Sequence, residues 1–339
     1  MNIINMRVNT KTLALMGAAF ALALLLSSVY QTFFVTPLHH NMGISVEDSP
    51  SQKTSDTGRA SSFETLDRHG SDAIVAVDES EARRLQKKVR VLVWVMTSPK
   101  SLDRARVVKS TWGTRADKDL FVFMSSEKDP SLPTVALAVK EGRDHLTAKT
   151  MQAFDYIYKH YFQKADFFMK ADDDAYVIME NLRYFLSHLN PNEAFVTGRH
   201  FRHHVKQGFP SGGAGYVISK ETLRRLALRS KDPPMCKEDG YLEDVELGRC
   251  LEKLGVPILN STDSRGRSRF HPYTPMHHVV KGLGKNYEYW DANIVRVGPD
   301  AINEFPISFH YIKPDEMKLL HFFLYNIRPY GINHKFSTT

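Results

Sequence analysis

The sequence lacks the short motifs that mark several large enzyme classes. It contains no GxxxxGK phosphate loop, no HExxH pair, no GxSxG elbow and no CxxC pair. These absences remove support for P-loop nucleotide hydrolases, zinc proteases, α/β-hydrolases and cysteine-rich zinc sites. Internal repeats are also missing. What remains, 339 residues with 42% hydrophobic and 24% charged residues, is the composition of a folded globular protein. A mainly disordered, collagen-like or polytopic membrane chain is excluded.

Only one long hydrophobic run is present. No charged residue lies between Lys11 and His39, and Leu13 to Val35 is almost wholly apolar. About 20 apolar residues can cross a bilayer as a helix. Bases precede the run and acids follow it, so residues 1–11 are predicted as a cytosolic tail, 12–37 as a transmembrane signal anchor, and the rest as lumenal. A cleaved signal peptide with Leu13–Leu26 as its apolar core is the alternative.

Residues 38–86 are rich in Ser, Asp, Glu and Thr without periodicity, and they are predicted as a flexible stem. The net charge of the whole chain is +7, and residues 87–339 alone carry +9. Such a surplus suits nucleic acid, an anionic membrane or a phosphorylated small molecule. Because the bases are scattered and the compartment is lumenal, nucleic acid is not expected as a partner.

Cysteine is scarce, with only Cys236 and Cys250, fourteen residues apart. A disulfide between them would close a short loop and stabilise the fold by about 3 kcal/mol; two free thiols are the alternative. The single clear glycosylation sequon, Asn260-Ser261-Thr262, follows a stretch that we expect at the surface.

From Val89 onward, short apolar runs alternate with amphipathic helical patterns. Strands are predicted at 89–96, 120–124, 134–139 and 166–171, and helices at 102–112, 146–162, 177–189, 219–229, 241–254 and 314–327. This alternation indicates βαβ crossovers and a mainly parallel central sheet in one α/β domain over residues 87–339.

Asp172-Asp173-Asp174 directly follows the strand predicted at 166–171. Ligands of open α/β sheets bind at the carboxyl ends of strands. Adjacent carboxylates repel each other unless a cation compensates, and oxygen ligands suit Mg²⁺ or Mn²⁺, which neutralise a diphosphate. A solvated acidic turn or a helix cap is the alternative.

Other segments could complete a nucleotide-sugar site. Glu141-Gly142-Arg143 and Lys149 could reach a diphosphate, and the turn at 211–216 could let backbone approach a ligand. Glu243-Asp244 also suits a helix cap, and His310 also suits the core. The doublets His203-His204 and His277-His278 are predicted as surface features.

Ten motifs in this order resemble those of the core 1 β1,3-galactosyltransferases, within the β1,3-glycosyltransferase group that includes Fringe: WVMTSP (94–99), STWGTR (110–115), FMSSE (123–127), KEGRD (140–144), MKADDDAYV (169–177), VKQG (205–208), SGGAGYV (211–217), EDVELGRC (243–250), SFHY (308–311) and RPYG (328–331). The resemblance covers about Val89 to Gly331. It implies a GT-A type nucleotide-sugar-binding domain behind a type II Golgi anchor.

The implied activity is the inverting transfer of galactose from UDP-galactose to the 3-hydroxyl of GalNAc on Ser or Thr, with Mn²⁺ as cofactor. Glycoprotein acceptors would be partners, and the sequence leaves a homodimer open. Carried over by motif, the resemblance assigns the residues as follows: metal, Asp172, Asp174 and His310; UDP, Met96, Glu141, Gly142, Arg143, Lys149, Asp172, His310 and Tyr311; catalytic base, Asp244; acceptor, Trp290, Gly212, Gly213 and Tyr216.

The sequence departs from the family at several positions. Members usually carry further cysteines where this chain has Val93, Ala116 and the Pro299-Asp300 stretch, so only Cys236 and Cys250 can pair. A Phe-Trp-Tyr-Trp stretch of the family reads Tyr287-Glu288-Tyr289-Trp290 here. Two alternatives to the galactosyltransferase are a catalytically silent relative that acts as a chaperone or partner, and a Fringe-like enzyme that uses another sugar.

Overall fold

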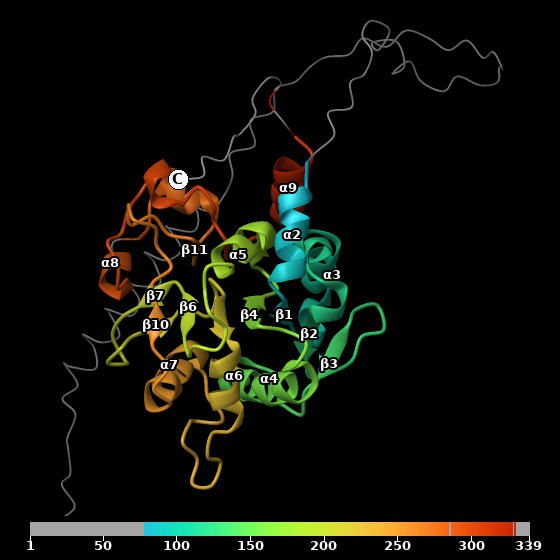
Figure 1. Cartoon of the computed structure of the whole chain (residues 1–339), viewed down its shortest axis with the longest axis vertical. Coiled ribbons are helices and arrows are strands. Elements are labelled where there is room, and N and C mark those ends of the chain that lie inside the picture. The colour runs from blue at the N-terminus through green and yellow to red at the C-terminus, as the bar shows by residue number, and fades with distance from the viewer. Residues whose placement is uncertain (1–77, 285, 328, 330–339) are drawn as a thin grey trace, which may run out of the picture. The chain divides into compact units, whose positions relative to one another are not determined.

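A computed structural model describes residues 78–284, 286–327 and 329, built around a seven-stranded mixed sheet (Figure 1). The strand order is β10-β6-β9-β4-β1-β2-β3. Strand β9 runs antiparallel to its neighbours β4 and β6, and the four other pairs are parallel. The predicted α/β class and mainly parallel sheet are therefore confirmed. The strands are β1 Val91–Met96, β2 Phe121–Ser125, β3 Thr134–Ala136, β4 Phe167–Asp172, β6 Val196–Gly198, β9 Tyr216–Ser219 and β10 Ile258–Leu259.

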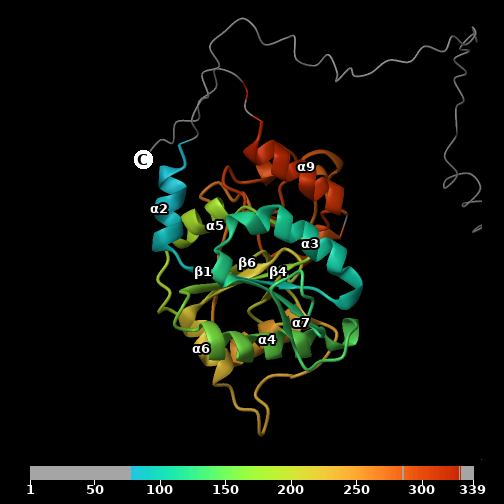
Figure 2. The same ribbon diagram turned by 90° about the vertical axis from the view of Figure 1, so that its right-hand side faces the viewer.

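Helices cover both faces of the sheet (Figure 2). Side chains alternate along a strand, so Val91, Val93 and Val95 of β1 point to one face, while Leu92 and Trp94 point to the other. The first set packs with α3 (Leu102–Ser110), α5 (Met179–Leu186) and α9 (Pro314–Tyr325). The second set packs with α4 (Leu146–Tyr161), α6 (Lys220–Ala227) and α7 (Glu243–Lys253). Because both faces are buried, β1 reads as an uninterrupted apolar run.

The predicted strands and helices are confirmed with shifted ends, but several short elements escaped the sequence analysis. The helix expected from Val177 begins at Met179, because Tyr176 and Val177 form β5. Elements of two to five residues are too short to leave a periodic signal. They include three strands of the central sheet, β6, β9 and β10. The others are β7 His200–Phe201, β8 Phe209–Pro210, β11 Phe270–His271, β12 Ser308–Phe309, α8 Tyr287–Trp290, the 3₁₀ turns at 99–101, 112–115, 118–120, 143–145 and 299–301, and a π-helical turn at 277–281.

The predicted flexible stem was wrong at its carboxyl end. Ser80–Lys88 forms helix α2, which packs against α5 and buries Leu85. Glu81 in the first turn and two lysines in the last turn complement the helix dipole, and one buried leucine docks the helix. The predicted tail, the anchor and the stem up to residue 77 lie outside the described residues. Within the described part of the chain, no helix is long and apolar enough to cross a membrane.

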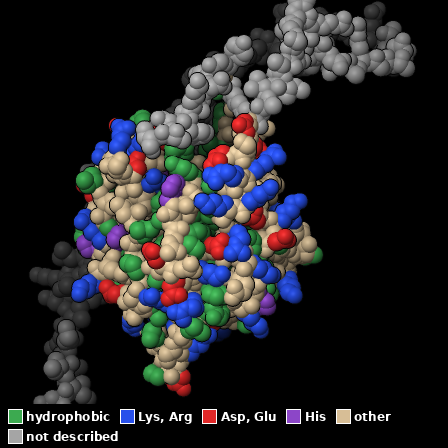
Figure 3. Space-filling model, viewed as in Figure 1, with side chains coloured by type: hydrophobic (Ala, Val, Ile, Leu, Met, Phe, Trp, Pro, Cys, Tyr) green, Lys and Arg blue, Asp and Glu red, His purple; other side chains and the backbone are tan. Residues whose placement is uncertain are grey.

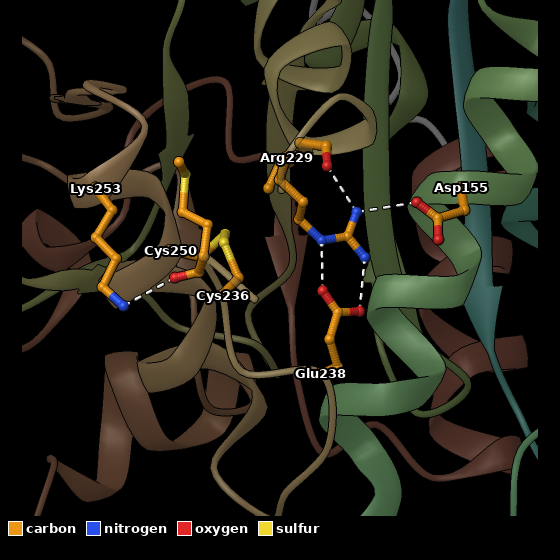
Figure 4. Close-up of a disulfide and its surroundings, with 8 residues drawn as sticks. Asp155, Arg229, Cys236, Glu238, Cys250 and Lys253 are labelled. Atoms are coloured by element: carbon orange, nitrogen blue, oxygen red, sulfur yellow. Dashed lines mark hydrogen bonds and ion pairs between the residues drawn. A yellow bond between two sulfur atoms is a disulfide. The ribbon is translucent and has the colours of Figure 1, made fainter. Parts of the chain in front are cut away.

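The predicted disulfide between Cys236 and Cys250 is confirmed, with a Cα–Cα distance of 5.0 Å (Figure 4). It fastens the loop before α7 to that helix. The same loop is held by Arg229, whose fully buried guanidinium donates hydrogen bonds to Glu238 and to Asp155 of α4 at 2.8 and 2.9 Å. These two attachments fix the position at which α7 begins.

On the surface, the predicted scattering of the bases is visible. In the space-filling view of Figure 3, Lys and Arg side chains are interspersed with acidic and hydrophobic ones over the visible face. Asn260 is exposed, as expected for the sequon, and its side-chain carbonyl accepts hydrogen bonds from Thr262. The family's cysteine positions Val93 and Ala116 lie in the apolar core.

Candidate active site

Two of the three consecutive aspartates meet a histidine from a distant part of the chain. Asp172 ends β4, and His310 follows β12. The imidazole Nε2 lies 3.1 Å from a carboxylate oxygen of Asp174 and 3.7 Å from one of Asp172. One ligand atom from each residue falls within 4.8 Å of the others, a spacing that a single cation could bridge. Two carboxylate oxygens and one imidazole nitrogen are donors that suit Mn²⁺.

His310 therefore lies beside the two carboxylates, and its role as a metal ligand stays a prediction. Its side chain keeps 12% of its surface exposed and faces the carboxylates. Burial tends to raise the pKa of Asp174, but the hydrogen bond and charge of His310 lower it below its ordinary value.

The middle aspartate of the triplet points elsewhere. Asp173 is buried, accepts a hydrogen bond from the Thr97 hydroxyl at 2.8 Å, and lies 3.6 Å from the guanidinium of Arg104. Burial raises the pKa of its carboxyl. Asp173 thus anchors the triplet to the end of β1 and leaves its two neighbours free to face the site.

The residues expected at UDP gather at the carboxyl ends of β1 and β4. Met96 of β1 lies in register with Asp172. The buried Lys149 ammonium donates to the carbonyl of Thr97 at 2.6 Å and pairs with Glu141 at 2.8 Å. Gly142 follows, with a φ of 120° that side chains disfavour. At this edge of the sheet, the charged Lys149 is held in one position, and Gly142 has no side chain that would keep a ligand from the backbone.

Arg143 and Tyr311 complete this group on its exposed side. The Arg143 guanidinium lies 3.4 Å from the hydroxyl of Tyr241, and the Tyr311 ring lies 3.9 Å from that of His310. Tyr311 adopts a left-handed φ of 59°. Partial burial, Tyr273 and Asp174 raise the pKa of the Tyr311 phenol.

The expected catalytic base, Asp244, lies in the first turn of α7. Its two carboxylate oxygens accept backbone hydrogen bonds, one from Gly212 at 3.2 Å and one from Val245 at 2.9 Å. Burial raises the pKa of Asp244. A carboxylate with a raised pKa holds a proton more strongly and is a better general base.

Asp244 lines a cavity of about 520 Å³ together with Trp290, the expected acceptor platform. The wall is largely aromatic and apolar, a surface suited to the CH faces of a sugar. The other lining residues are Phe201, His204, Phe209, Leu242, Val245, Tyr273, Gly284, Asn286 and Tyr287. The sequence did not reveal that Tyr273, Tyr287 and His204 line this cavity, because four separate segments of the chain form its wall.

A buried ion network that the sequence analysis missed joins the two halves of the site. The Lys170 ammonium lies 2.6 Å from an oxygen of Asp172 and donates to the carbonyl of Gly212 at 3.0 Å. Burial alone would lower the pKa of Lys170, but the carboxylates of Asp172 and Glu243 raise it above its ordinary value. The available signal was a lysine inside the otherwise apolar strand at 166–171.

Tyr216 does not meet the expectation of an acceptor contact. Its ring is fully buried, and its hydroxyl donates to Glu243 at 2.9 Å. The Thr150 hydroxyl donates to the same Glu243 oxygen at 3.1 Å. Because the Tyr216 side chain has no exposed surface, it cannot contact an acceptor directly. Its role in the structure is to hold the Glu243 carboxylate in place.

The two glycines expected near the acceptor are required by close packing. A Cβ at Gly212 would lie 2.8 Å from an oxygen of Glu243, and one at Gly213 would overlap the imidazole of His310. Strand β9 runs antiparallel to β4 and pairs Tyr216 with Lys170. The loop before β9 therefore lies beside the aspartates that follow β4.

One of the histidine doublets was placed wrongly. His203 and His204 are at the surface, as predicted, but His278 is buried beside His271, with their ring centroids 4.8 Å apart. Burial and the charge of Arg199 lower the pKa of His278 to about 4.

The chain belongs to the Fringe-like family, whose sequence model matches residues 87–271. It is 39% identical over 265 residues to glycoprotein-N-acetylgalactosamine 3-beta-galactosyltransferase 1 of Xenopus laevis, covering 77% of this chain and 73% of that protein. It is 29% identical to a mouse beta-1,3-glucosyltransferase, over 66% of this chain and 41% of the relative. The resemblance to the core 1 β1,3-galactosyltransferases is thereby confirmed.

Solved structures are more distant. The galactosyltransferase LgtC, in complex with donor and acceptor sugar analogs, superposes with a TM-score of 0.40 and 10% identity, over 70% of this chain and 97% of its own. The catalytic domain of Drosophila beta1,4galactosyltransferase 7 gives a TM-score of 0.30 and 12% identity, over 51% and 64%. These superpositions are too loose to support a conclusion about this chain.

Proposed function

We propose that the protein transfers galactose from UDP-galactose to the 3-hydroxyl of GalNAc linked to Ser or Thr, with inversion at the anomeric carbon. One observation carries this proposal. Gly212 joins the two halves of the site, because its N–H holds Asp244 while its carbonyl binds Lys170, which pairs with Asp172. A carboxylate in an aromatic cavity thus lies next to a carboxylate and histidine group suited to a metal and diphosphate.

On the donor side, Asp172, Asp174 and His310 would hold Mn²⁺, whose charge would stabilise the diphosphate leaving group. The chain itself adds Lys149 and Arg143, two cations on the same sheet edge. Lys149 is held by the Thr97 carbonyl and Glu141, so its charge is oriented before a ligand arrives. Met96, Gly142 and Tyr311 would contact the nucleotide.

On the acceptor side, the reaction needs a base opposite the leaving group, since a single in-line displacement inverts the anomeric carbon. We assign this role to Asp244, which would take the proton of the attacking hydroxyl. Trp290 would support the acceptor sugar, and the Gly212 N–H would hold the Asp244 carboxylate in place.

We also propose that this domain is of the GT-A type and lies in the Golgi lumen behind the anchor at residues 12–37. The disulfide between Cys236 and Cys250 and the exposed sequon at Asn260 support an oxidising, glycosylating compartment. In this arrangement residues 1–11 are cytosolic, and the domain at 87–339 gains helix α2 at its amino end.

The test is a transfer reaction with the full chain purified in detergent. The protein is incubated with Mn²⁺, UDP-galactose and a peptide carrying GalNAc-Thr, and the product is weighed by mass spectrometry. Addition of one hexose, shown by linkage analysis to be β1,3, supports the proposal. UDP binding without any transfer would point to another sugar or acceptor, and absence of UDP binding would favour the silent partner.

A further inference from the structure

The turn Arg202–His204, which we name the basic turn, has an unusual backbone. His203 and His204 adopt left-handed φ angles of 71° and 53° in succession. Residues with a Cβ rarely adopt this conformation, and each instance costs free energy unless the surroundings enforce it. Among the described residues, the only other non-glycine with positive φ is Tyr311, next to the proposed metal ligand His310.

The strained backbone places the basic turn against the end of α8. The carbonyls of Glu288 and Tyr289 accept hydrogen bonds from the Arg202 guanidinium at 2.6 and 2.9 Å. The Trp290 carbonyl accepts one from the Arg202 backbone N–H at 2.8 Å. His203 Nε2 donates to Tyr289 as well, at 2.7 Å. A helix end leaves its last carbonyls without partners, so these contacts fix the one-turn helix that carries Trp290.

Both histidine rings also pack on aromatic side chains of α8. The His203 ring stacks on Tyr289 with centroids 3.9 Å apart and planes 10° from parallel. The His204 ring stacks on Trp290 at 5.3 Å and 26°. His204 lines the same cavity as Trp290 and Asp244. Its imidazole forms no hydrogen bond among the described residues, so both ring nitrogens are available to a ligand.

We propose that the basic turn determines how the enzyme binds its acceptor glycopeptide. Arg202 and His203 act as positioning residues that hold Trp290, and His204 forms a wall of the cavity that contacts the acceptor directly. This inference rests on the proposed function, since it takes the occupant of the cavity to be the GalNAc-bearing peptide. The inference adds His204 as a residue that determines acceptor specificity, separate from the proposed metal ligands and from the proposed base.

The substitution His204→Asn tests the role of the imidazole ring separately from the role of the backbone conformation. Asparagine tolerates left-handed φ better than other residues with a side chain, so the turn is retained while the stacked ring is lost. A ring contact between His204 and the bound acceptor would change the binding equilibrium by about three- to tenfold. The expected result is an acceptor dissociation constant raised by that factor, with UDP affinity unchanged.

The matched control is His160→Asn. His160 is exposed on α4 and packs on Tyr156 away from the cavity, with ring centroids 4.3 Å apart and planes tilted by 34°. The His160→Asn variant also loses an imidazole ring and its contact with a neighbouring aromatic ring. Acceptor affinity should therefore remain at the wild-type value.

Tryptophan fluorescence gives a direct readout in the full chain. The chain has three tryptophans, and Trp94 and Trp112 are fully buried, so a change on adding acceptor reports on Trp290. A GalNAc-Thr peptide is titrated in the presence of Mn²⁺ and UDP, and UDP binding is measured separately by calorimetry. His203→Asn should also shift the Trp290 emission before any acceptor is added, because it removes both contacts to Tyr289.

The outcomes separate this inference from the proposed function. If the wild type binds the glycopeptide without transferring galactose and His204→Asn weakens that binding, the proposed function fails and the inference holds. If the wild type transfers galactose and His204→Asn binds acceptor as the wild type does, the inference is overturned. It is equally overturned if UDP affinity falls in parallel, or if the wild type does not bind the glycopeptide.

Discussion

Replacement of Asp244 by asparagine tests the assignment of the base most directly. Each carboxylate oxygen accepts one backbone N–H, from Gly212 and from Val245, so the amide must turn its NH₂ group toward one of them. The weaker contact, to Gly212 at 3.2 Å, is the one expected to be lost, at a cost of about 1 kcal/mol. The variant should therefore fold and keep the shape of the cavity.

Catalysis should suffer far more than stability in this variant. Loss of a general base lowers the rate by roughly 10² to 10⁴, equivalent to about 3 to 5 kcal/mol of barrier. The assay measures kcat for galactose transfer to a GalNAc-Thr peptide, together with UDP binding in the presence of Mn²⁺. We expect UDP affinity within about twofold of wild type. A kcat within threefold of wild type would refute the assignment of Asp244.

The pH profile supplies a second measurement on the same residue. Burial raises the pKa of Asp244, and the protonated carboxyl cannot act as a base. Wild-type kcat/KM should fall as the pH drops through that raised pKa, whereas the residual activity of Asp244→Asn should lack this acid limb. Glu246→Gln is the matched control, because Glu246 lies on the same helix, pairs with Arg249 and does not line the cavity.

Three further measurements follow from the site and its surroundings. Removal of divalent cations by a chelator should abolish transfer and added Mn²⁺ should restore it, whereas turnover that resists the chelator would exclude the group formed by Asp172, Asp174 and His310. Gly213→Ala should displace His310 and raise the Mn²⁺ concentration needed for half-maximal activity by about tenfold or more; Gly284→Ala, where a Cβ meets no atom within 4 Å, should leave that concentration unchanged. His278 should stay neutral in the folded chain down to a pH of about 4, while an unfolded histidine gains its proton near 6.5. The contribution of His278 to the free energy of unfolding is therefore fully present above pH 6.5. It is lost as the pH falls toward 4, by up to about 3 kcal/mol. Urea unfolding at pH 7.5 and 4.5 should show a smaller loss in His278→Gln than in wild type, and equal losses would contradict the buried neutral histidine.

The sequence predicted those parts of the fold whose signal is local. Strand β1 was found because both of its faces are buried and every residue from Val91 to Met96 is apolar. The carboxyl end of β4 was found because three aspartates follow an apolar run. Helix α2 was missed because a single leucine docks it, which leaves no apolar stripe to detect.

The site was predictable only as far as its motifs extend. Asp172 and Asp174 could be proposed from their place after a strand, but His310 follows them by more than 130 residues and was assigned only through the family resemblance. The distances of 3.1 and 3.7 Å depend on the pairing of β12 with β5. The charge of Glu243 acts on Lys170 from a distant part of the chain, and such long-range interactions leave no spacing rule in one sequence.

The reversed direction of β9 has a consequence for how such an enzyme can change during evolution. Because this strand runs against β4, the loop at 211–215 precedes its strand and still reaches the edge where Asp172 and Asp174, the proposed metal ligands, lie. The residues proposed to bind the donor come mainly from loops after parallel strands, while the cavity wall comes from segments around β7, β8 and α8. Substitutions in those segments can alter the acceptor while the donor half is inherited unchanged, so one ancestral domain can give rise to enzymes that modify different glycans.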